Sequence, residues 1–282
     1  MSIKIITDSA SDILPEQYSD VIVLPMSISF DETLYLDGVT LTRDQFFEKL
    51  VESDTLPKTS QINPATFESA FSKIKSDGDE AIVITMSSDL SGTYQSACIA
   101  AEDYSDCISV IDSKTVCIGE HILIKEAIAC LSSSSYTDRE QLASYLESVK
   151  NKVQVIALLN TLEFLRRGGR ISNTVGAIGE ALSIKPVIAI SEGVVKILGK
   201  ARGSKNANNL LNDKINAHNG INYDKAFAVA YSGLSDAMLS KYLSDNTDLW
   251  EAHADNLIRS QIGGTIGTHA GPDAIALAFF EN

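Results

Sequence analysis

Residues 82–97 read IVITMSSDLSGTYQSA, and this stretch decides the fold. Its apolar start predicts a buried strand, a hydroxyl-rich loop follows, and a helix is expected to begin near Thr93. In open α/β sheets, ligands bind beyond the carboxyl ends of the strands, where helix N-termini present free N–H groups. The stretch therefore favours an α/β protein. Its loop has two interpretations: Ser91, Gly92 and Thr93 form an anion site, or Ser91 or Gly92 is an ordinary helix N-cap.

The same alternation of strand and helix runs through the first 160 residues. It is typical of a mostly parallel sheet with helices on both faces, so we expect an N-terminal α/β/α sandwich over residues 1–160. Apolar runs predict further strands at 3–7, 21–24, 107–111 and 153–159, and a hairpin or irregular segment at 26–39. Capping signals and apolar periodicity predict helices at 42–52, 63–76, 93–101, 116–131 and 137–150.

The remaining residues, 161–282, follow a different pattern. A hairpin is expected at 186–198, and a glycine-rich stretch at 263–271 precedes a final strand at 274–280. Hairpins mixed with helices favour an α+β domain with a largely antiparallel sheet. The expected helices lie at 161–167, 173–182, 204–217 and 235–243, and a further strand at 226–231.

Length and charge exclude several classes of function. At about 150 residues per domain, 282 residues predict two domains. The chain has 23 Lys and Arg against 37 Asp and Glu, a net charge of −14, which argues against general nucleic-acid binding and against adsorption to an anionic membrane. No apolar run reaches the length of about 18 residues that a membrane span needs, and Met1–Asp8 is expected to be a first strand rather than a signal peptide. Since the four cysteines have no CxxC spacing, we expect a cytoplasmic protein with reduced core thiols.

Three further segments place polar groups where a ligand could bind. Residues 57–64, PKTSQINP, precede a capped helix and form either a binding loop or a solvated turn. Residues 263–272, GGTIGTHAGP, set His269 among glycines that let a ligand approach closely, although a lone histidine is usually structural. Residues 165–172, LRRGGRIS, hold three arginines in an acidic chain. With Lys196, Lys200, Arg202 and Lys205 these arginines form either a basic island for an anion or an acidic partner, or ordinary charge at a helix C-terminus.

The common catalytic motifs are missing from the sequence. It contains no GxSxG nucleophile elbow, no Walker A or GxGxxG phosphate loop, and no HExxH or paired-cysteine metal site. We therefore expect no cofactor, no metal and no catalytic residue of these types.

Five short motifs resemble those of the DegV family, in the same order and over essentially the whole chain. The resemblance is more specific than any one motif, although Asp273 stands where the family often has glycine, and Ile62-Asn63 intervene before Pro64. The motifs are Thr7-Asp8-Ser9, Thr59-Ser60-Gln61, Ser91-Gly92-Thr93-Tyr94, Gly168-Gly169-Arg170-Ile171 and Gly267-Thr268-His269-Ala270-Gly271-Pro272.

This resemblance implies a function. It implies one long-chain fatty acid, such as hexadecanoate, in a buried tunnel between the two domains. Some bacterial members of the family are the B subunit of a fatty acid kinase of phospholipid metabolism. They have no turnover of their own and present the carboxylate to an ATP-using subunit for phosphorylation.

The resemblance also implies roles for particular residues. Thr59 and Ser91 would hydrogen-bond the carboxylate, and His269 would lie beside it. Arg170 and Arg202 would face the partner kinase. The residues expected to support the carboxylate site are Ser60, Gly92 and Thr93.

Two other functions stay open on the residues alone. Ser91 and His269 are the nucleophile and base that a serine acyl hydrolase needs, provided that the serine sits on a strained turn. Alternatively, the helix N-termini bind a small anion or a phosphorylated metabolite.

Overall fold

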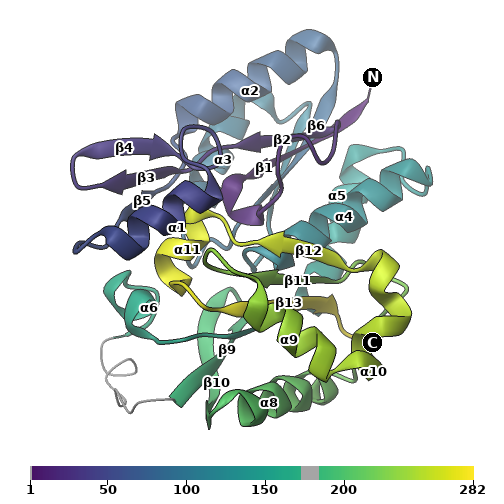
Figure 1. Cartoon of the computed structure of the whole chain (residues 1–282). Coiled ribbons are helices and arrows are strands. Elements are labelled where there is room, and N and C mark those ends of the chain that lie inside the picture. The colour runs from purple at the N-terminus through teal and green to yellow at the C-terminus, as the bar shows by residue number, and fades with distance from the viewer. Residues whose placement is uncertain (1, 173–183) are drawn as a thin grey trace.

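Three β-sheets and the helices around them form the fold (Figure 1). The computed structural model describes residues 2–172 and 184–282. The helix expected at 173–182 lies outside the described residues. Among these residues, none of the helices combines the length and the apolar character needed to cross a bilayer.

The first part of the chain forms a parallel sheet, as the sequence predicted. Its strands are β1 (Ile3–Asp8), β2 (Val21–Leu24), β6 (Glu80–Thr85) and β7 (Ile108–Asp112). They stand in the order β2-β1-β6-β7, and every neighbouring pair is parallel. The helices are α2 (Pro64–Asp77), α3 (Thr93–Ala101), α4 (Ile118–Ser132) and α5 (Arg139–Val149). Since α2 packs with α3, α4 packs with α5 and both pairs contact the sheet, β1 and β6 are largely buried, and residues 81–84 of β6 form a continuous apolar run.

The second sheet is mostly antiparallel, which also agrees with the prediction. Its strands are β8 (Val153–Leu158), β9 (Ile184–Ser191), β10 (Val194–Arg202), β11 (Ala228–Tyr231), β12 (Ile258–Gln261) and β13 (Ile275–Phe280). They stand in the order β10-β9-β8-β13-β11-β12, and only the β11–β12 pair is parallel. The accompanying helices are α8 (Ser204–Ala217), α9 (Ala237–Asp245) and α10 (Thr247–Trp250).

Strand β8 is the main departure from the expected organisation. The sequence placed residues 153–159 in the N-terminal unit, which we expected to end at residue 160. In the structure β8 pairs with β9 and β13, so the change of sheet falls before Val153. An apolar strand sequence does not specify its neighbours, because pairing depends on segments far along the chain.

Helix α4 is the layer that the two large sheets share. It contacts β1 and β6 of the parallel sheet, and it also contacts β8, β11 and β13 of the second sheet. One continuous hydrophobic core therefore runs from the first sheet to the second.

A small third sheet lies beside these layers. It contains β3 (Ser27–Phe30), β4 (Thr33–Leu36) and β5 (Lys58–Ser60), in the order β4-β3-β5, and it carries α1 (Arg43–Glu52). Helix α11 (Gly264–Ala270) packs against α1 and against α6 (Glu163–Arg167). The chain also forms short 3-10 turns at Ser9–Ser11, Glu102–Tyr104, Lys150–Lys152 and Glu251–Asn256.

Helix α11 replaces the glycine-rich stretch that the sequence suggested. Glycine costs roughly 1 kcal/mol relative to alanine inside a helix, so this segment is a poor helix by propensity. Close packing explains why it forms. A Cβ on Gly264 would lie 2.5 Å from Ile28 Cδ1, and one on Gly267 would lie 2.7 Å from Phe46 Cε1. The glycines therefore let α11 sit directly on the aromatic face of α1.

Candidate functional site

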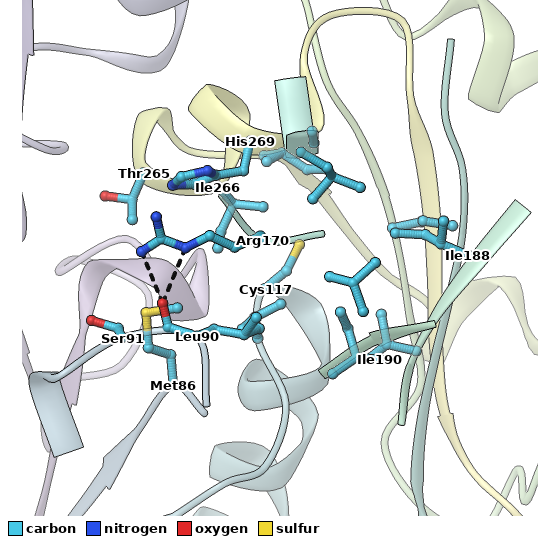
Figure 2. Close-up of a pocket in the computed structure, with 18 of the residues that line it drawn as sticks. Met86, Leu90, Ser91, Cys117, Arg170, Ile188, Ile190, Thr265, Ile266 and His269 are labelled. Atoms are coloured by element: carbon cyan, nitrogen blue, oxygen red, sulfur yellow. Dashed lines mark hydrogen bonds between the residues drawn. The ribbon is translucent and has the colours of Figure 1, made fainter. Parts of the chain in front are cut away.

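A pocket opens where the parallel sheet, the second sheet and α11 meet (Figure 2). Its cavity volume is about 100 Å³, which is enough for several water molecules. Most of the lining side chains are apolar, and the few polar ones gather at one end. Such a pocket suits a ligand with a long apolar part and a single polar group.

Strand β13 explains how the second sheet leaves room for this pocket. Small and large side chains alternate from the residue before the strand onward: Ala274 and Ala276 line the pocket, whereas Ile275 and Leu277 pack in a separate core on the other face. Ala276 stands opposite Ala157 of β8 in the sheet register, and Ala157 also lines the pocket. Because both side chains are small, they leave space for the pocket on this face of the second sheet.

The β9–β10 hairpin forms the apolar end. Ile188 and Ile190 of β9 line the pocket, together with Val195 of β10. Figure 2 shows Ile188 and Ile190 across the pocket from Ser91 and His269.

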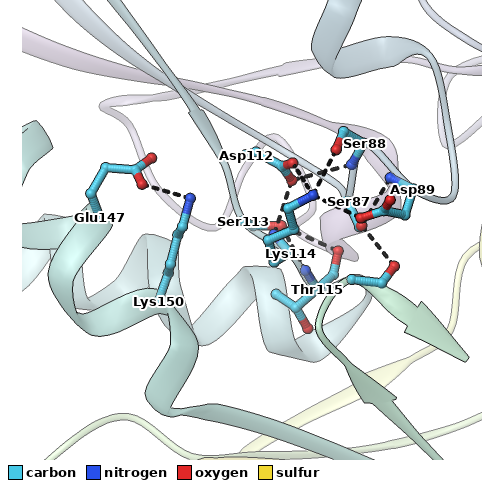
Figure 3. A network of polar contacts seen from close by, with 10 residues as sticks. Ser87, Ser88, Asp89, Asp112, Ser113, Lys114, Thr115, Glu147 and Lys150 are labelled. Carbon is cyan, nitrogen blue, oxygen red and sulfur yellow. Dashed lines mark hydrogen bonds and ion pairs between the residues drawn. The ribbon is translucent and has the colours of Figure 1, made fainter. Parts of the chain in front are cut away.

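The tip of this hairpin is fixed to the loop that follows β6. Ser87 Oγ donates a hydrogen bond to the main-chain oxygen of Gly193, at 2.7 Å. Beside it, Lys114 Nζ lies 2.7 Å from Asp89 Oδ2 and 3.0 Å from Asp112 Oδ2 (Figure 3). The hairpin and the loop that carries Ser91 are therefore held as one unit.

At the polar end, Thr59 and His269 come together from β5 and α11. Thr59 Oγ1 lies 3.1 Å from His269 Nε2, although the two residues are 210 positions apart. Burial, and to a smaller extent the charge of Arg170, lowers the pKa of His269 to about 4. The imidazole is therefore neutral at pH 7. Its Nδ1 is buried and has no hydrogen-bond partner among the described residues.

Ser91 enters the same end from the loop before α3. Its Oγ lies 3.0 Å from Thr93 Oγ1 and accepts a hydrogen bond from the Thr93 N–H at 3.3 Å. Thr93 itself is fully buried and does not line the pocket, so its contacts hold the Ser91 side chain in place. Gly92 holds the N-cap position of α3, and the side-chain amide of Gln61 lies where a Cβ of Gly92 would be. This side chain lies beside the helix N-terminus at which the sequence allowed an anion site.

Arg170 lines the pocket, where the sequence had placed it on a surface that faces a partner. Its Nε and Nη2 donate to the main-chain oxygen of Leu90 at 3.2 and 2.9 Å, and Nη1 donates to that of Gly168 at 2.7 Å. The contact with Leu90 draws the guanidinium inward, and the side chain is half-buried. No carboxylate forms an ion pair with Arg170 within the two described ranges. Among the described residues, no carboxylate therefore neutralises its charge at the polar end of the pocket.

The other expected site residues lie elsewhere. Arg202 is exposed at the end of β10 and does not line the pocket. Ser60 is exposed because it alternates with Thr59 along β5. Sequence reasoning had not assigned a role to Gln61 or Thr265, which both line the pocket. Gln61 lies just after β5 and belongs to the Thr59-Ser60-Gln61 motif, and this membership is the signal that could have identified it.

The serine and the histidine that a hydrolase would use hydrogen-bond other partners. Ser91 Oγ contacts Thr93, and His269 Nε2 contacts Thr59, so the serine and the histidine form no nucleophile–base pair. Groups of three or more potential metal ligands are also missing from residues 2–172 and 184–282.

Comparisons with known proteins show the family to which the chain belongs. A family model described as "Uncharacterised protein, DegV family" matches residues 2–282. A DegV domain-containing protein of Caldanaerobacter subterraneus subsp. tengcongensis is 33% identical over 99% of both chains. A fatty-acid-binding DegV family protein from Thermus thermophilus is 26% identical, with a TM-score of 0.87 over 100% of both chains. The fatty acid kinase B3 protein of Streptococcus pneumoniae, solved with linoleic acid, shares the fold at 22% identity, with a TM-score of 0.84 over 100% of both chains. The chain described here belongs to the DegV family.

Proposed function

We propose that this protein binds one long-chain fatty acid, such as hexadecanoate, in the pocket between the two large sheets. The carboxylate lies at the end that holds Thr59, Ser91 and Arg170, and the alkyl chain extends toward Ile188 and Ile190. The observation that carries this proposal is the polarity of the pocket, which joins the Arg170 guanidinium, unpaired with any carboxylate of the described residues, to a long apolar wall.

The apolar wall supplies most of the binding free energy. Burying about 14 methylene groups at roughly 0.8 kcal/mol each gives on the order of 11 kcal/mol of gross stabilisation. Ordering a flexible chain offsets part of this gain. The fatty-acid-binding relative from Thermus thermophilus supports this class of ligand.

The polar end orients the ligand. When neutral His269 carries its proton on Nε2, it donates to Thr59 Oγ1 and leaves the Thr59 hydroxyl free to donate to a carboxylate. Three of the five guanidinium N–H groups of Arg170 bind main-chain oxygens, so two remain for the ligand. Each hydrogen bond to a charged carboxylate contributes about 1.5–3 kcal/mol.

The proposed role is that of a cytoplasmic carrier, without turnover of its own. Ser91 and His269 lack the contact that acyl hydrolysis needs. In this proposal the protein presents the bound carboxylate to an ATP-using kinase subunit, which phosphorylates it. The shared fold of the Streptococcus pneumoniae fatty acid kinase protein supports this step, and exposed Arg202 is a candidate contact for the partner.

Three versions of the protein test carrier against hydrolase: wild type, His269→Ala and His269→Gln. Each is assayed for hexadecanoic acid retention and for cleavage of a chromogenic short-chain ester, without a partner. We expect no ester cleavage by any of them, reduced fatty-acid occupancy in His269→Ala with the fold intact, and partial recovery in His269→Gln, which keeps a hydrogen-bond donor. Ester cleavage by wild type that both variants lose would overturn the carrier proposal.

A further inference from the structure

Two buried carboxylates lie outside the pocket, yet they bind the element that carries His269. Asp12 follows β1, and Asp37 follows β4. Their exposed fractions are only 1% and 4%. Burial of a carboxylate is costly unless donors surround it, so the donors identify what these residues do.

Asp37 caps helix α11 from a distant part of the chain. Its Oδ1 accepts a hydrogen bond from the Gly264 N–H at 3.1 Å. Its Oδ2 accepts from the N–H and the hydroxyl of Thr265 at 3.0 and 2.5 Å, and from Ser9 Oγ at 3.1 Å. The N-cap residue of α11 is Gly263, which has no side chain to accept these hydrogen bonds. Asp37, which is 227 positions before Gly264, accepts them from the free N–H groups instead.

Asp12 fixes the residue immediately before the helix. Its Oδ1 accepts from the Gly263 N–H at 2.7 Å, and its Oδ2 accepts from Cys117 Sγ at 2.8 Å. Arg43 Nη2 donates to the main-chain oxygen of Asp12 at 2.8 Å, and Nη1 of the same guanidinium donates to Ser260 Oγ at 3.2 Å. The N-terminus of α11 is thus tied to the first strand and to α1.

The position of His269 depends on this attachment. Helix α11 has seven residues, about 10 Å at 1.5 Å per residue, and His269 lies in its last turn. The helix also lies against Phe46, with no Cβ on Gly264 or Gly267 to keep them apart. Because the helix is short and rigid, a tilt at its N-terminus would displace the imidazole from Thr59.

We propose that Asp12 and Asp37 are positioning residues for the carboxylate-binding end of the pocket. They hold the N-terminus of α11 and so place His269 against Thr59. This proposal rests on the proposed fatty-acid binding. It assigns a function to Asp12, which lies in the turn that begins with the Thr7-Asp8-Ser9 motif.

The test compares binding of hexadecanoic acid with binding of 1-hexadecanol, which has the same chain and no carboxylate. We expect Asp37→Asn to lower the affinity for hexadecanoic acid about tenfold. The affinity for 1-hexadecanol should fall less than about threefold, because the apolar wall is unchanged. Asp138→Asn is the matched control, since Asp138 caps α5 by accepting from the Gln141 N–H and does not line the pocket. Asp138→Asn should leave the affinities for both ligands unchanged. An equal loss of acid and alcohol in Asp37→Asn, or no loss of either, would contradict the proposal.

A second comparison shows whether Asp37 acts through His269. In a His269→Ala background, Asp37→Asn should lower the affinity for hexadecanoic acid less than about twofold further, because the imidazole that Asp37 positions is already absent. A full tenfold loss in that background would mean that Asp37 acts independently and would overturn the proposal.

Two further results would have a different meaning: an Asp37→Asn variant that does not fold, and a wild-type protein that binds neither ligand. If Asp37→Asn does not fold, Ser9→Ala decides, because it removes one hydrogen bond to Asp37 Oδ2 and leaves the carboxylate in place. A selective loss of acid binding supports the proposal, and an equal loss of both ligands or no loss overturns it. If wild type binds neither ligand, the proposed function itself is wrong, and the inference falls with it.

Discussion

The two ends of the pocket are built in different ways. The apolar end consists of strands, in which Ile188, Ile190 and Ala276 are held by regular sheet pairing. The polar end consists of loops and helix termini, in which Thr59 and His269 meet across 210 residues of chain. Strand side chains contribute area, whereas the polar end depends on a few hydrogen bonds whose geometry other residues must maintain.

This difference predicts how each end tolerates change. Adding bulk at the apolar end should block the chain, whatever its head group is. Removing one hydroxyl at the polar end should weaken only ligands that carry a carboxylate.

Ala276→Phe should have the largest effect. The side chain faces the pocket floor opposite Ala157, so a phenyl ring would occupy the path of the alkyl chain. We expect hexadecanoic acid and 1-hexadecanol to bind at least ~100-fold more weakly, as measured by calorimetry. Leu277→Phe is the control, because Leu277 is on the other face of the same strand. Equal losses in both variants would mean that the floor of the pocket is not where the chain lies.

Thr59→Ala and Ser91→Ala should each weaken hexadecanoic acid by about tenfold or more, because each removes a hydrogen bond to a charged group. Circular dichroism should be unchanged. Ser60→Ala is the matched control, since it removes a neighbouring hydroxyl that is exposed. If both pocket variants purify with full ligand, the carboxylate lies elsewhere.

The two arginines should separate lipid binding from partner recognition. Arg170→Gln should lower affinity for the acid about tenfold and affect the alcohol less, because Arg170 is the cation at the polar end. Arg202→Glu should leave lipid content intact and lower phosphorylation by a partner kinase. Loss of lipid in Arg202→Glu would contradict this division.

The smallest effect concerns pH. Burial lowers the pKa of His269 to about 4, so the imidazole is neutral throughout the range from pH 6 to pH 8. We expect the affinity for hexadecanoic acid to change less than about twofold over this range. If His269 titrated near its unperturbed pKa of about 6.5, its positive charge would strengthen binding as the pH falls to 6. A rise of that kind, absent from His269→Gln, would show that the histidine is charged in the complex.

The fold was predictable wherever local signals specify an element. Apolar runs and capping residues, such as Asn63 before Pro64, identified the parallel sheet and its helices. The placement of β8 was not predictable, because its sequence suits a strand in either sheet. Helix α11 was missed because its cap, Asp37, comes from a segment that lies far away in the sequence.

The site shows the same limit. The resemblance of the short motifs to the DegV family implied that Thr59, Ser91 and His269 share a site, and in the structure all three line one pocket. The inward direction of Arg170 was not predictable, because it depends on a contact with the main-chain oxygen of Leu90. Local patterns reveal which residues are chemically suited to a site, whereas tertiary contacts decide which way they point.

The most direct test of the central claim is mass spectrometry of an organic extract from the purified wild-type protein, quantified against the protein itself. We expect close to one fatty acid per chain, released only on denaturation, and a reduced amount from a Thr59→Ala, Ser91→Ala double variant. An extract that contains no fatty acid, or a phosphorylated metabolite in its place, would contradict it.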